Sequence, residues 1–330
     1  MAVHTDQLNS MTHEQYWPDV ISQVTTETPF MTRLFKNASK NGSGVSFKWT
    51  AAYKMDDGQW YSGYEILDTT PIDEFREAEL DWRNFNIPCS ISAEELYKNS
   101  GKEAFHDLLA NKMKLVRDRA RYYMGRGVFR GGGAAAKEWH GLYLGANTGV
   151  IAELPTSRAY AGITAGTDDT GSGDFTNWWQ NHYIDGSNAA LDQGDFTAMF
   201  HELASRSAKT SIIVTTFAGM NALEVSMLAS QRFVTPHPEI AALGFTSISL
   251  KGVPVVGDVH CYEGATSTSS AFYFLDESDL VLRFVKGRFM AKTPWMKPTD
   301  QDAQVMHVRN SGVFAVLTPR KHGIIHSVAN

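Results

Sequence analysis

The sequence predicts an α+β fold, and three patterns support that prediction. Residues 101–130 carry apolar side chains at the 3.6-residue spacing of an amphipathic helix. Residues 45–93 and 244–314 alternate apolar and polar side chains with period two, which is typical of half-buried strands. Between these β-rich parts, residues 196–228 contain two helical patterns on either side of a short buried-strand pattern, SIIVT at 211–215. Helices and strands therefore occur in separate runs, as expected for an α+β protein.

Length and composition indicate a globular chain with a substantial core. The chain has 330 residues and a mass of 36.6 kDa, enough for one large domain or two of intermediate size. No apolar run approaches the roughly 20 residues that span a bilayer, and the first residues lack the features of a signal peptide. We therefore expect no membrane association, and we expect Cys89 and Cys261 to be free thiols in a reducing cytosol.

The net charge bears on nucleic-acid partners. Its formal value is −6, with an isoelectric point of about 6.0. Proteins that grip nucleic acid usually carry a concentrated basic surface, so this balance counts against a sequence-reading DNA-binding protein. It is compatible with a container, whose lining should let a packed polyanion slide rather than stick.

Residues 1–44 are expected to form an extended arm with one or two short helices. Thr28-Pro29 interrupts the helical spacing, and residues 36–44 have the composition of a polar linker. Two interpretations remain open, a flexible terminus and a strap over a neighbouring subunit.

Residues 45–93 are expected to form a two-stranded β-excursion with a long polar tip. Val45, Phe47 and Trp49 alternate on the outgoing limb, and the return limb has its apolar side chains at Leu80, Trp82, Phe85 and Ile87. A connection this long inside a compact domain is unusual. The aromatic residues Trp60, Tyr61 and Tyr64 suggest that the tip is buried against something outside the subunit. The alternative is a solvent-exposed hairpin.

The clearest helix covers residues 101–130. Ser100 and Glu103 have the spacing of a capping box, and Gly125, Gly127 and the glycine run at 131–133 are expected to end the helix. At 1.5 Å per residue it would be about 45 Å long. Residues 134–194 are rich in loops and include the pair Trp178-Trp179.

The C-terminal third predicts antiparallel strands joined by polar turns. The turn at 277–279 separates two apolar runs, and a loop with Pro294, Trp295 and Pro298 interrupts the sheet before it resumes at Gln304.

No residue pattern suits catalysis or cofactor binding. The chain has neither a phosphate-binding loop nor a nucleophile elbow. His322 and His326 have helical ligand spacing but lie in a β-rich tail, and the acidic turn at 168–174 lacks the ligand spacing of a calcium loop. We therefore predict no catalytic, cofactor-binding or metal-binding residues, and no enzyme.

Three phrases in the C-terminal third carry a family resemblance. KGVPVV at 251–256, YFLDESDLVLRF at 273–284 and TPWMKPT at 293–299 follow one another in this order, after an arm, a β-excursion and a long helix. This order resembles the major capsid proteins of tailed bacteriophages, which have the Hong Kong 97-type fold. The resemblance implies an N-terminal arm (1–44), an extended loop (45–93), a peripheral domain with a spine helix (94–165 and 286–330) and an axial domain (166–285).

The resemblance also implies function and partners. Subunits would form hexamers and pentamers that close into an icosahedral shell around double-stranded DNA, assembled in the host cytoplasm and found in the virion. Many relatives begin with a scaffolding segment that a protease removes; here the arm begins almost at Met1, which implies a separate scaffolding protein or none. A portal and decoration proteins are further candidate partners. Neither partner of the covalent crosslink found in some relatives can be aligned, so non-covalent stabilisation is expected.

Charge suggests which elements meet between subunits. Residues 54–83 hold nine acidic and three basic groups, whereas residues 102–130 hold eight basic and three acidic groups. The extended loop of one subunit is therefore expected to lie across the helix of the next, and the alternative is that the basic helix faces DNA. The predicted intersubunit residues are Trp60, Tyr61, Glu74, Glu77, Glu79, Arg117, Arg119, Arg121, Trp295 and Lys297.

Two other functions remain open. One is an encapsulin-like nanocompartment with the same fold, which would hold cargo protein instead of nucleic acid. The other is a small β-rich hydrolase or glycan-binding protein that uses Trp60, Tyr61 and Trp178-Trp179 as an exposed platform.

Overall fold

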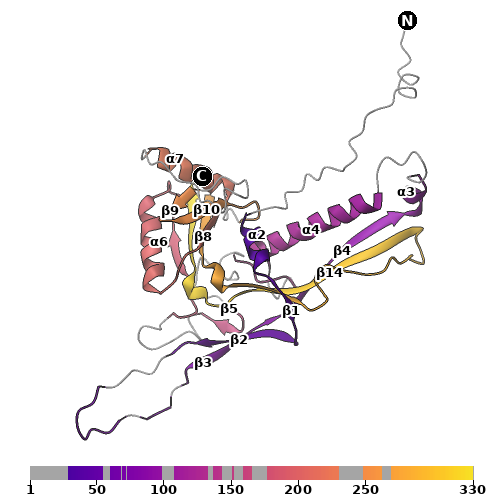
Figure 1. Cartoon of the computed structure of the whole chain (residues 1–330). Coiled ribbons are helices and arrows are strands. Elements are labelled where there is room, and N and C mark those ends of the chain that lie inside the picture. The colour runs from indigo at the N-terminus through magenta and orange to yellow at the C-terminus, as the bar shows by residue number, and fades with distance from the viewer. Residues whose placement is uncertain are drawn as a thin grey trace.

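Two β-sheets, each with its own helices, organise the chain (Figure 1). The computed structural model describes residues 29–54, 60–67, 69–71, 73–98, 108–132, 137–142, 151, 159–165, 177–229, 248–261 and 269–329. Within these ranges one sheet has five strands and the other six, and two short two-stranded ladders lie outside them. This mixture of helices with mainly antiparallel sheets confirms the predicted α+β class.

The five-stranded sheet is built around one long strand, β14 (Ala303–Val316). Its first part pairs with β4 (Arg83–Ser92) and its last part with β12 (Leu280–Val285), both antiparallel. Two short strands complete the sheet, β13 (Ala291–Lys292) beside β14 and β1 (Ser39–Gly42) parallel to β12.

The helix α4 (Leu108–Arg130) runs alongside β4 (Figure 1). Val116, Ala120, Met124 and Val128 are buried at four-residue intervals, so one apolar stripe of the helix faces the protein interior. Gly125 and Gly127 lie inside the helix and do not end it, contrary to the prediction. The helix ends at Arg130. At the next residue, Gly131, the backbone of Trp139 passes so close that a Cβ on residue 131 would overlap the Trp139 carbonyl oxygen, so glycine is required at this position.

The predicted helix start falls outside the described residues, since 99–107 are not among them. A capping box does occur nearby, at the start of the short helix α3 (Ala93–Lys98). The Ser92 hydroxyl accepts from the Glu95 backbone N–H at 3.0 Å, and the Glu95 carboxylate accepts from the Ser92 N–H at 3.1 Å.

The six-stranded sheet has the order β7-β15-β11-β8-β10-β9. Its strands are β7 (His182–Asp185), β8 (Ile212–Thr215), β9 (Ile248–Leu250), β10 (Val253–Gly257), β11 (Ser269–Leu275) and β15 (Gly323–Ala329). Every residue of β8 and β11 is buried, so these two form the centre of the sheet. The helices α6 (Gln193–Ser205) and α7 (Phe217–Ala229) cover it, and Phe196, Met199 and Leu223 pack into its apolar cluster.

Two short 3₁₀ turns carry the chain directly from a strand of one sheet to a strand of the other. A 3₁₀ turn at Glu277–Asp279 links β11 to β12, and another at Pro319–Lys321 links β14 to β15. The peripheral range 94–165 with 286–330 and the axial range 166–285 stay predictions, and sheet membership follows the strand pairing. Strand β12 belongs to the five-stranded sheet, and the C-terminal strand β15 lies between β7 and β11 in the other.

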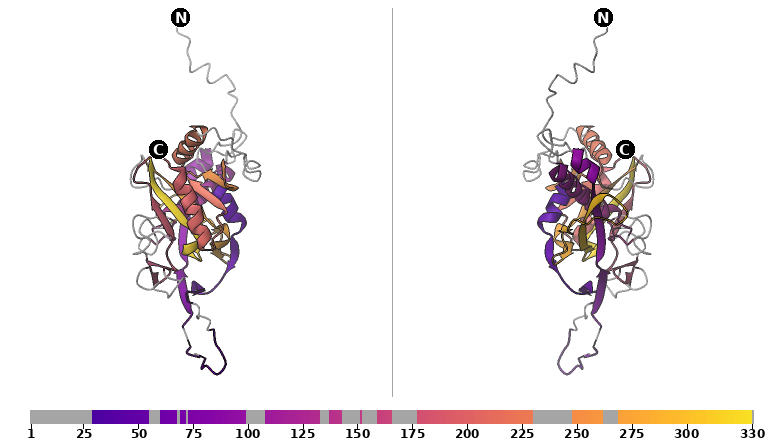
Figure 2. Two further views of the ribbon diagram at one scale, coloured as in Figure 1. Left: turned by 90° about the vertical axis from the view of Figure 1, so that its left-hand side faces the viewer. Right: turned by 90° about the vertical axis from the view of Figure 1, so that its right-hand side faces the viewer.

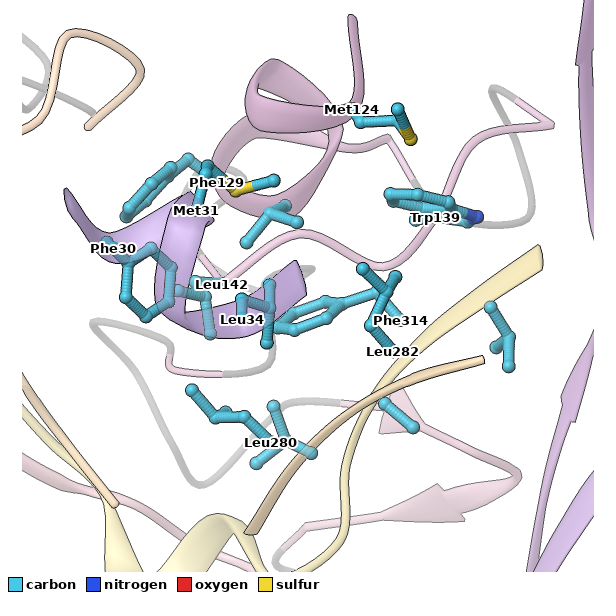
Figure 3. Packing of buried hydrophobic residues seen from close by; sticks show 14 of the residues in the cluster. Phe30, Met31, Leu34, Met124, Phe129, Trp139, Leu142, Leu280, Leu282 and Phe314 are labelled. Carbon is cyan, nitrogen blue, oxygen red and sulfur yellow. The ribbon is translucent and has the colours of Figure 1, made fainter. Parts of the chain in front are cut away.

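One apolar cluster joins the arm, the spine-like helix and the five-stranded sheet (Figure 3). Phe30 and Leu34 come from helix α2 (Pro29–Lys36), Phe129 from α4, and Leu280 and Phe314 from the sheet. Burying each such side chain contributes about 1.5–3 kcal/mol. Residues 29–44 are thus neither a linker nor a flexible terminus: Pro29 begins a helix, as proline does at a first helical position, and Ser39–Gly42 is a strand.

The hairpin of β2 (Ser46–Ala52) and β3 (Phe75–Asp81) projects away from the rest of the molecule (Figures 1 and 2). This part of the predicted excursion is present, but it is shorter than residues 45–93. Phe85 and Ile87 lie in β4 and pair with β14 instead of returning along β2. Alternation identified both strands correctly and could not identify their partners.

Candidate interaction surfaces

The tip of the β2–β3 hairpin exposes large apolar side chains. Trp60 is 99% exposed, Ile66 94% and Tyr61 65%, while Tyr64 is as open as in an extended chain. Scattered apolar residues on a surface are ordinary, but four large ones within residues 60–66 favour an interaction site or an aggregation hazard. The exposure of these side chains fits both interpretations of the sequence, a tip buried against something outside the subunit and a solvent-exposed hairpin.

The limbs of the hairpin carry an acidic face. Glu77 and Glu79 are exposed on β3, and Glu74 is partly exposed just before it. Lys48 on β2 lies between them, with its Nζ 2.6 Å from Glu77 Oε1 and 3.3 Å from Glu79 Oε2. Hydrogen bonds to the two carboxylates raise the pKa of Lys48, and hydrogen bonds from Ser46 and then Lys48 lower the pKa of Glu79. The count of charges over residues 54–83 does not include Lys48. Because Lys48 partly neutralises Glu77 and Glu79, the hairpin face is less negative than that count indicates.

The exposed side of α4 is basic. Arg117, Arg119 and Arg121 are all exposed. At 3.6 residues per turn Arg117 and Arg121 share one flank of the buried stripe, and Arg119 lies on the other flank. Lys112 instead binds within the chain: its Nζ donates to Glu95 Oε2 at 2.6 Å and to the Ser90 carbonyl at 3.1 Å. That hydrogen bond from Lys112, and then the one from the Ser92 backbone, lower the pKa of Glu95.

The structure does not bring the acidic hairpin and the basic helix together within one chain. Figures 1 and 2 show the hairpin projecting from the end of the molecule away from α4. Any contact between Glu77 or Glu79 and Arg117, Arg119 or Arg121 would therefore be made between two copies.

Trp295 and Lys297 lie in the loop that connects β13 to β14. The loop is held to β14 by a bridge between Met296 and Val305, with both N–H···O distances at 2.8–2.9 Å. Trp295 is partly buried and packs against the main apolar cluster of its own subunit. Lys297 is exposed and pairs with Asp302 at 2.8 Å. The loop lies where the sequence predicts it, whereas the packing of Trp295 against its own subunit was not predicted.

The aromatic pair at 178–179 is not a surface platform. Trp178 is 4% exposed and Trp179 1%, and Trp179 stacks on Trp49 and Tyr160. The Trp179 indole N–H donates to the Tyr160 carbonyl at 3.1 Å. These residues anchor the base of the hairpin to the body of the protein, which removes half of the platform expected for a glycan-binding protein.

The described residues show no constellation suited to metal chemistry. In these ranges of the chain, no three histidine, cysteine, aspartate or glutamate side chains lie close enough together to hold a metal ion. His322 and His326 serve separate partners: His322 Nδ1 accepts from the Asp276 N–H at 3.3 Å, while His326 stacks on Tyr183. Burial raises the pKa of Asp279, which lies 3.9 Å from His322 at the crossing between the sheets. Among the residues that the structure describes, no helix is both long enough and apolar enough to cross a membrane.

Comparison with known proteins gives a clear result for the fold and none from sequence. No protein-family model matches the chain, and no curated protein does. Among solved structures, a chain of the cyanophage A-1(L) capsid asymmetric unit superposes with a TM-score of 0.70 at 14% identity, covering 97% of this chain and 98% of that one. The capsid of the native GTA particle gives 0.67 at 12% identity, covering 100% and 99%.

A third similar structure is a shell of a different kind. The holo-SrpI encapsulin complex from Synechococcus elongatus PCC 7942 gives a TM-score of 0.63 at 11% identity, covering 100% of this chain and 97% of that one. These likenesses confirm the predicted Hong Kong 97-type fold, which is the fold of tailed-phage major capsid proteins.

Proposed function

We propose that this chain is the major shell protein of a tailed-phage head and that it assembles into hexamers and pentamers of an icosahedral particle enclosing double-stranded DNA. The observation that carries the proposal is the β2–β3 hairpin, which projects from the body of the molecule (Figure 1) and in which Trp60 and Ile66 lie almost fully in solvent. A free subunit gains nothing from that exposure, whereas a neighbouring copy would cover it. The full-length likeness to phage capsid chains supports the same assignment.

The intersubunit contacts follow from the exposed charges. The acidic hairpin face with Glu74, Glu77 and Glu79 would lie across Arg117, Arg119 and Arg121 on α4 of the next copy, with Trp60 and Tyr61 anchoring the tip. Trp295 and Lys297 would meet symmetry-related copies near threefold positions. In this arrangement the chain acts structurally and not as an enzyme.

Several partners belong to the same proposal. A shell of this kind would assemble in the host cytoplasm with a separate scaffolding protein and a portal, could carry decoration proteins, and would reside in the virion.

An encapsulin-like nanocompartment is the second candidate, favoured by the likeness to the SrpI encapsulin. The two differ in content, since one encloses nucleic acid and the other cargo protein. The hydrolase or glycan-binding alternative loses half of its platform because Trp178 and Trp179 are buried, whereas Trp60 and Tyr61 are exposed.

Expression of the full chain, followed by light scattering and negative-stain microscopy, tests the proposal. Closed particles of uniform diameter are expected, alone or with a co-expressed scaffolding protein. A protein that remains monomeric at high concentration under all such conditions would overturn it. Particles isolated from cells would then be treated with nuclease and analysed for protected DNA or for a second protein, which separates the two shell functions.

A further inference from the structure

Basic side chains gather in two grooves that share the same stretch of strand β4. One groove, of about 480 Å³, lies between α4 and β4 and is lined by Arg83, Arg126, Arg130 and Lys137. The other, of about 390 Å³, is lined by Arg288 and Arg309. Residues Asn84–Asn86 of β4 line both, so the grooves adjoin. For a chain with a net charge of −6, this is a strong local concentration of positive charge.

Acidic groups do not neutralise these grooves. The single carboxylate in the two linings is Glu138, and it accepts from the Gly132 backbone N–H at 2.9 Å. Arg83 pairs with Asp81 at 3.3 Å, and Arg130 donates to the Cys261 carbonyl at 3.1 Å. The remaining four cations, Arg126, Lys137, Arg288 and Arg309, are exposed and form no ion pair with any residue that the structure describes.

The chemistry of the grooves indicates a polyanion with repeated charges. Because the backbone of β4 separates the two groups of cations, a single small anion would engage one groove and leave the other empty. Five of the six cations are arginines, whose planar guanidinium binds phosphate oxygens in pairs. The aromatic side chains that interfaces between proteins use as anchors are mostly covered in these grooves: Trp139 is 6% exposed and Phe85 packs edge-on against it. Nucleic-acid interfaces are instead polar and positively charged.

We propose that the paired grooves flanking Asn84–Asn86 form a sequence-independent binding site for the phosphates of a nucleic acid. The inference rests on the proposed function in one respect, because it identifies the surface that would face the enclosed DNA. The contact proposed above between α4 and the acidic hairpin of a neighbouring copy uses Arg117, Arg119 and Arg121, which do not line either groove. Tyr123, which is 55% exposed at the edge of the first groove, is the one exposed aromatic side chain in the two linings.

The test uses the full chain before assembly and a 30-base-pair DNA duplex of random sequence. Binding is followed by fluorescence anisotropy over a series of salt concentrations. Two variants each remove two groove cations, Arg126→Gln with Lys137→Gln, and Arg288→Gln with Arg309→Gln. The matched control, Lys36→Gln with Lys209→Gln, removes two exposed cations that lie outside both grooves.

Each groove variant is expected to reduce the slope of log K against log salt by about two, one for each lost phosphate contact, and the control to leave it almost unchanged. The duplex sequence should not matter. An equal effect of the control would overturn the site. Poly-L-glutamate competing as well as DNA, charge for charge, would also overturn it in favour of an acidic protein partner. Particle formation, scored separately, reports on the proposed function: a chain that never assembles can still show the groove-dependent slope, and one that assembles can lack it.

Discussion

Gly125 in the middle of α4 lies in direct contact with the imidazole of His260, so that a methyl group at position 125 would stand 2.7 Å from His260 Nε2. His260 follows strand β10 of the six-stranded sheet, and its backbone N–H is held by Asp258 Oδ1 at 2.8 Å. The ring also packs edge-on against Tyr122, with 4.9 Å between ring centres. The helix beside one sheet is thereby locked to a turn of the other.

The first prediction follows from this contact. Gly125→Ala should lower the free energy of unfolding by about 1–3 kcal/mol, because overpacking outweighs the better helix propensity of alanine. Gly127→Ala is the matched control, since its nearest neighbour would be Trp139 Cε3 at 3.4 Å, an ordinary contact. That variant should gain up to about 1 kcal/mol. Urea denaturation of both measures the difference, and equal stabilisation would show that His260 moves aside without cost.

The second prediction concerns pH. Burial lowers the pKa of His260, helped by the nearby Arg130, and burial also lowers the pKa values of His140 and His182. A base whose pKa is lower in the folded state binds more protons when unfolded, so stability falls as the pH drops below about 6.5. His260→Gln should make the free energy of unfolding less dependent on pH between 7.5 and 5.5, whatever its effect at pH 7.5. A steep dependence that survives in His260→Gln would assign it to His140 and His182.

The sequence predicts local structure here far better than it predicts partners. The amphipathic spacing from Val116 to Val128 located the long helix, because a buried stripe leaves a periodic trace. No such trace shows that β4 leaves the hairpin and pairs with β14 more than 200 residues later, since alternation is the same for any partner. Gly125 was predicted from the sequence to end the helix. In the structure it lies inside the helix and leaves room for His260, a contact that the sequence does not predict.

For the candidate interaction surfaces, too, local features could be predicted from the sequence and contacts between distant residues could not. Exposed aromatics in a polar tip were predictable, because nothing in residues 45–93 could cover Trp60. Pairing of Lys48 with Glu77 and Glu79 depends on the register of β2 and β3, which places Lys48 opposite Glu79. Trp179 is covered in part by Trp49 and Trp178 by Tyr53, two residues of the hairpin strand β2 and its end that lie far away in the sequence.

The third prediction tests the hairpin tip. Trp60→Ser combined with Tyr64→Ser should leave the unfolding transition of the subunit unchanged, because both side chains are exposed, and should prevent particle formation. Tyr97→Ser, at a tyrosine that is 80% exposed on α3, is the control and should assemble normally. Light scattering and thermal unfolding measure the two properties. Assembly of the double variant at the normal rate would remove the tip from the interface.

The fourth prediction concerns Trp295, for which sequence reasoning expected an intersubunit anchor. Because the side chain is partly buried against its own subunit, Trp295→Ala should cost the subunit about 1–2 kcal/mol, less than a fully buried tryptophan, and should impair assembly more strongly than that loss explains. Trp295→Phe keeps the inner contact and should restore most of the stability. Comparison of urea denaturation with particle yield separates the effects. If the phenylalanine variant is stable and assembles fully, Trp295 serves only its own subunit.

The fifth prediction tests the charge contact between copies. Reversing Glu74, Glu77 and Glu79 to lysine should slow assembly about tenfold or more at low salt, within the range of electrostatic steering, and the effect should shrink at high salt. Reversing Arg117, Arg119 and Arg121 to glutamate in the same chain should partly restore the rate, because the two fields are again complementary. Lys48→Gln is the necessary control, since the glutamate reversals also break its pairs with Glu77 and Glu79 inside the hairpin. If Lys48→Gln alone slows assembly as much, the hairpin's own structure is responsible. If the triple glutamate reversal assembles normally at low salt, the hairpin does not lie on α4, and the arginine face of the helix is better assigned to the enclosed DNA.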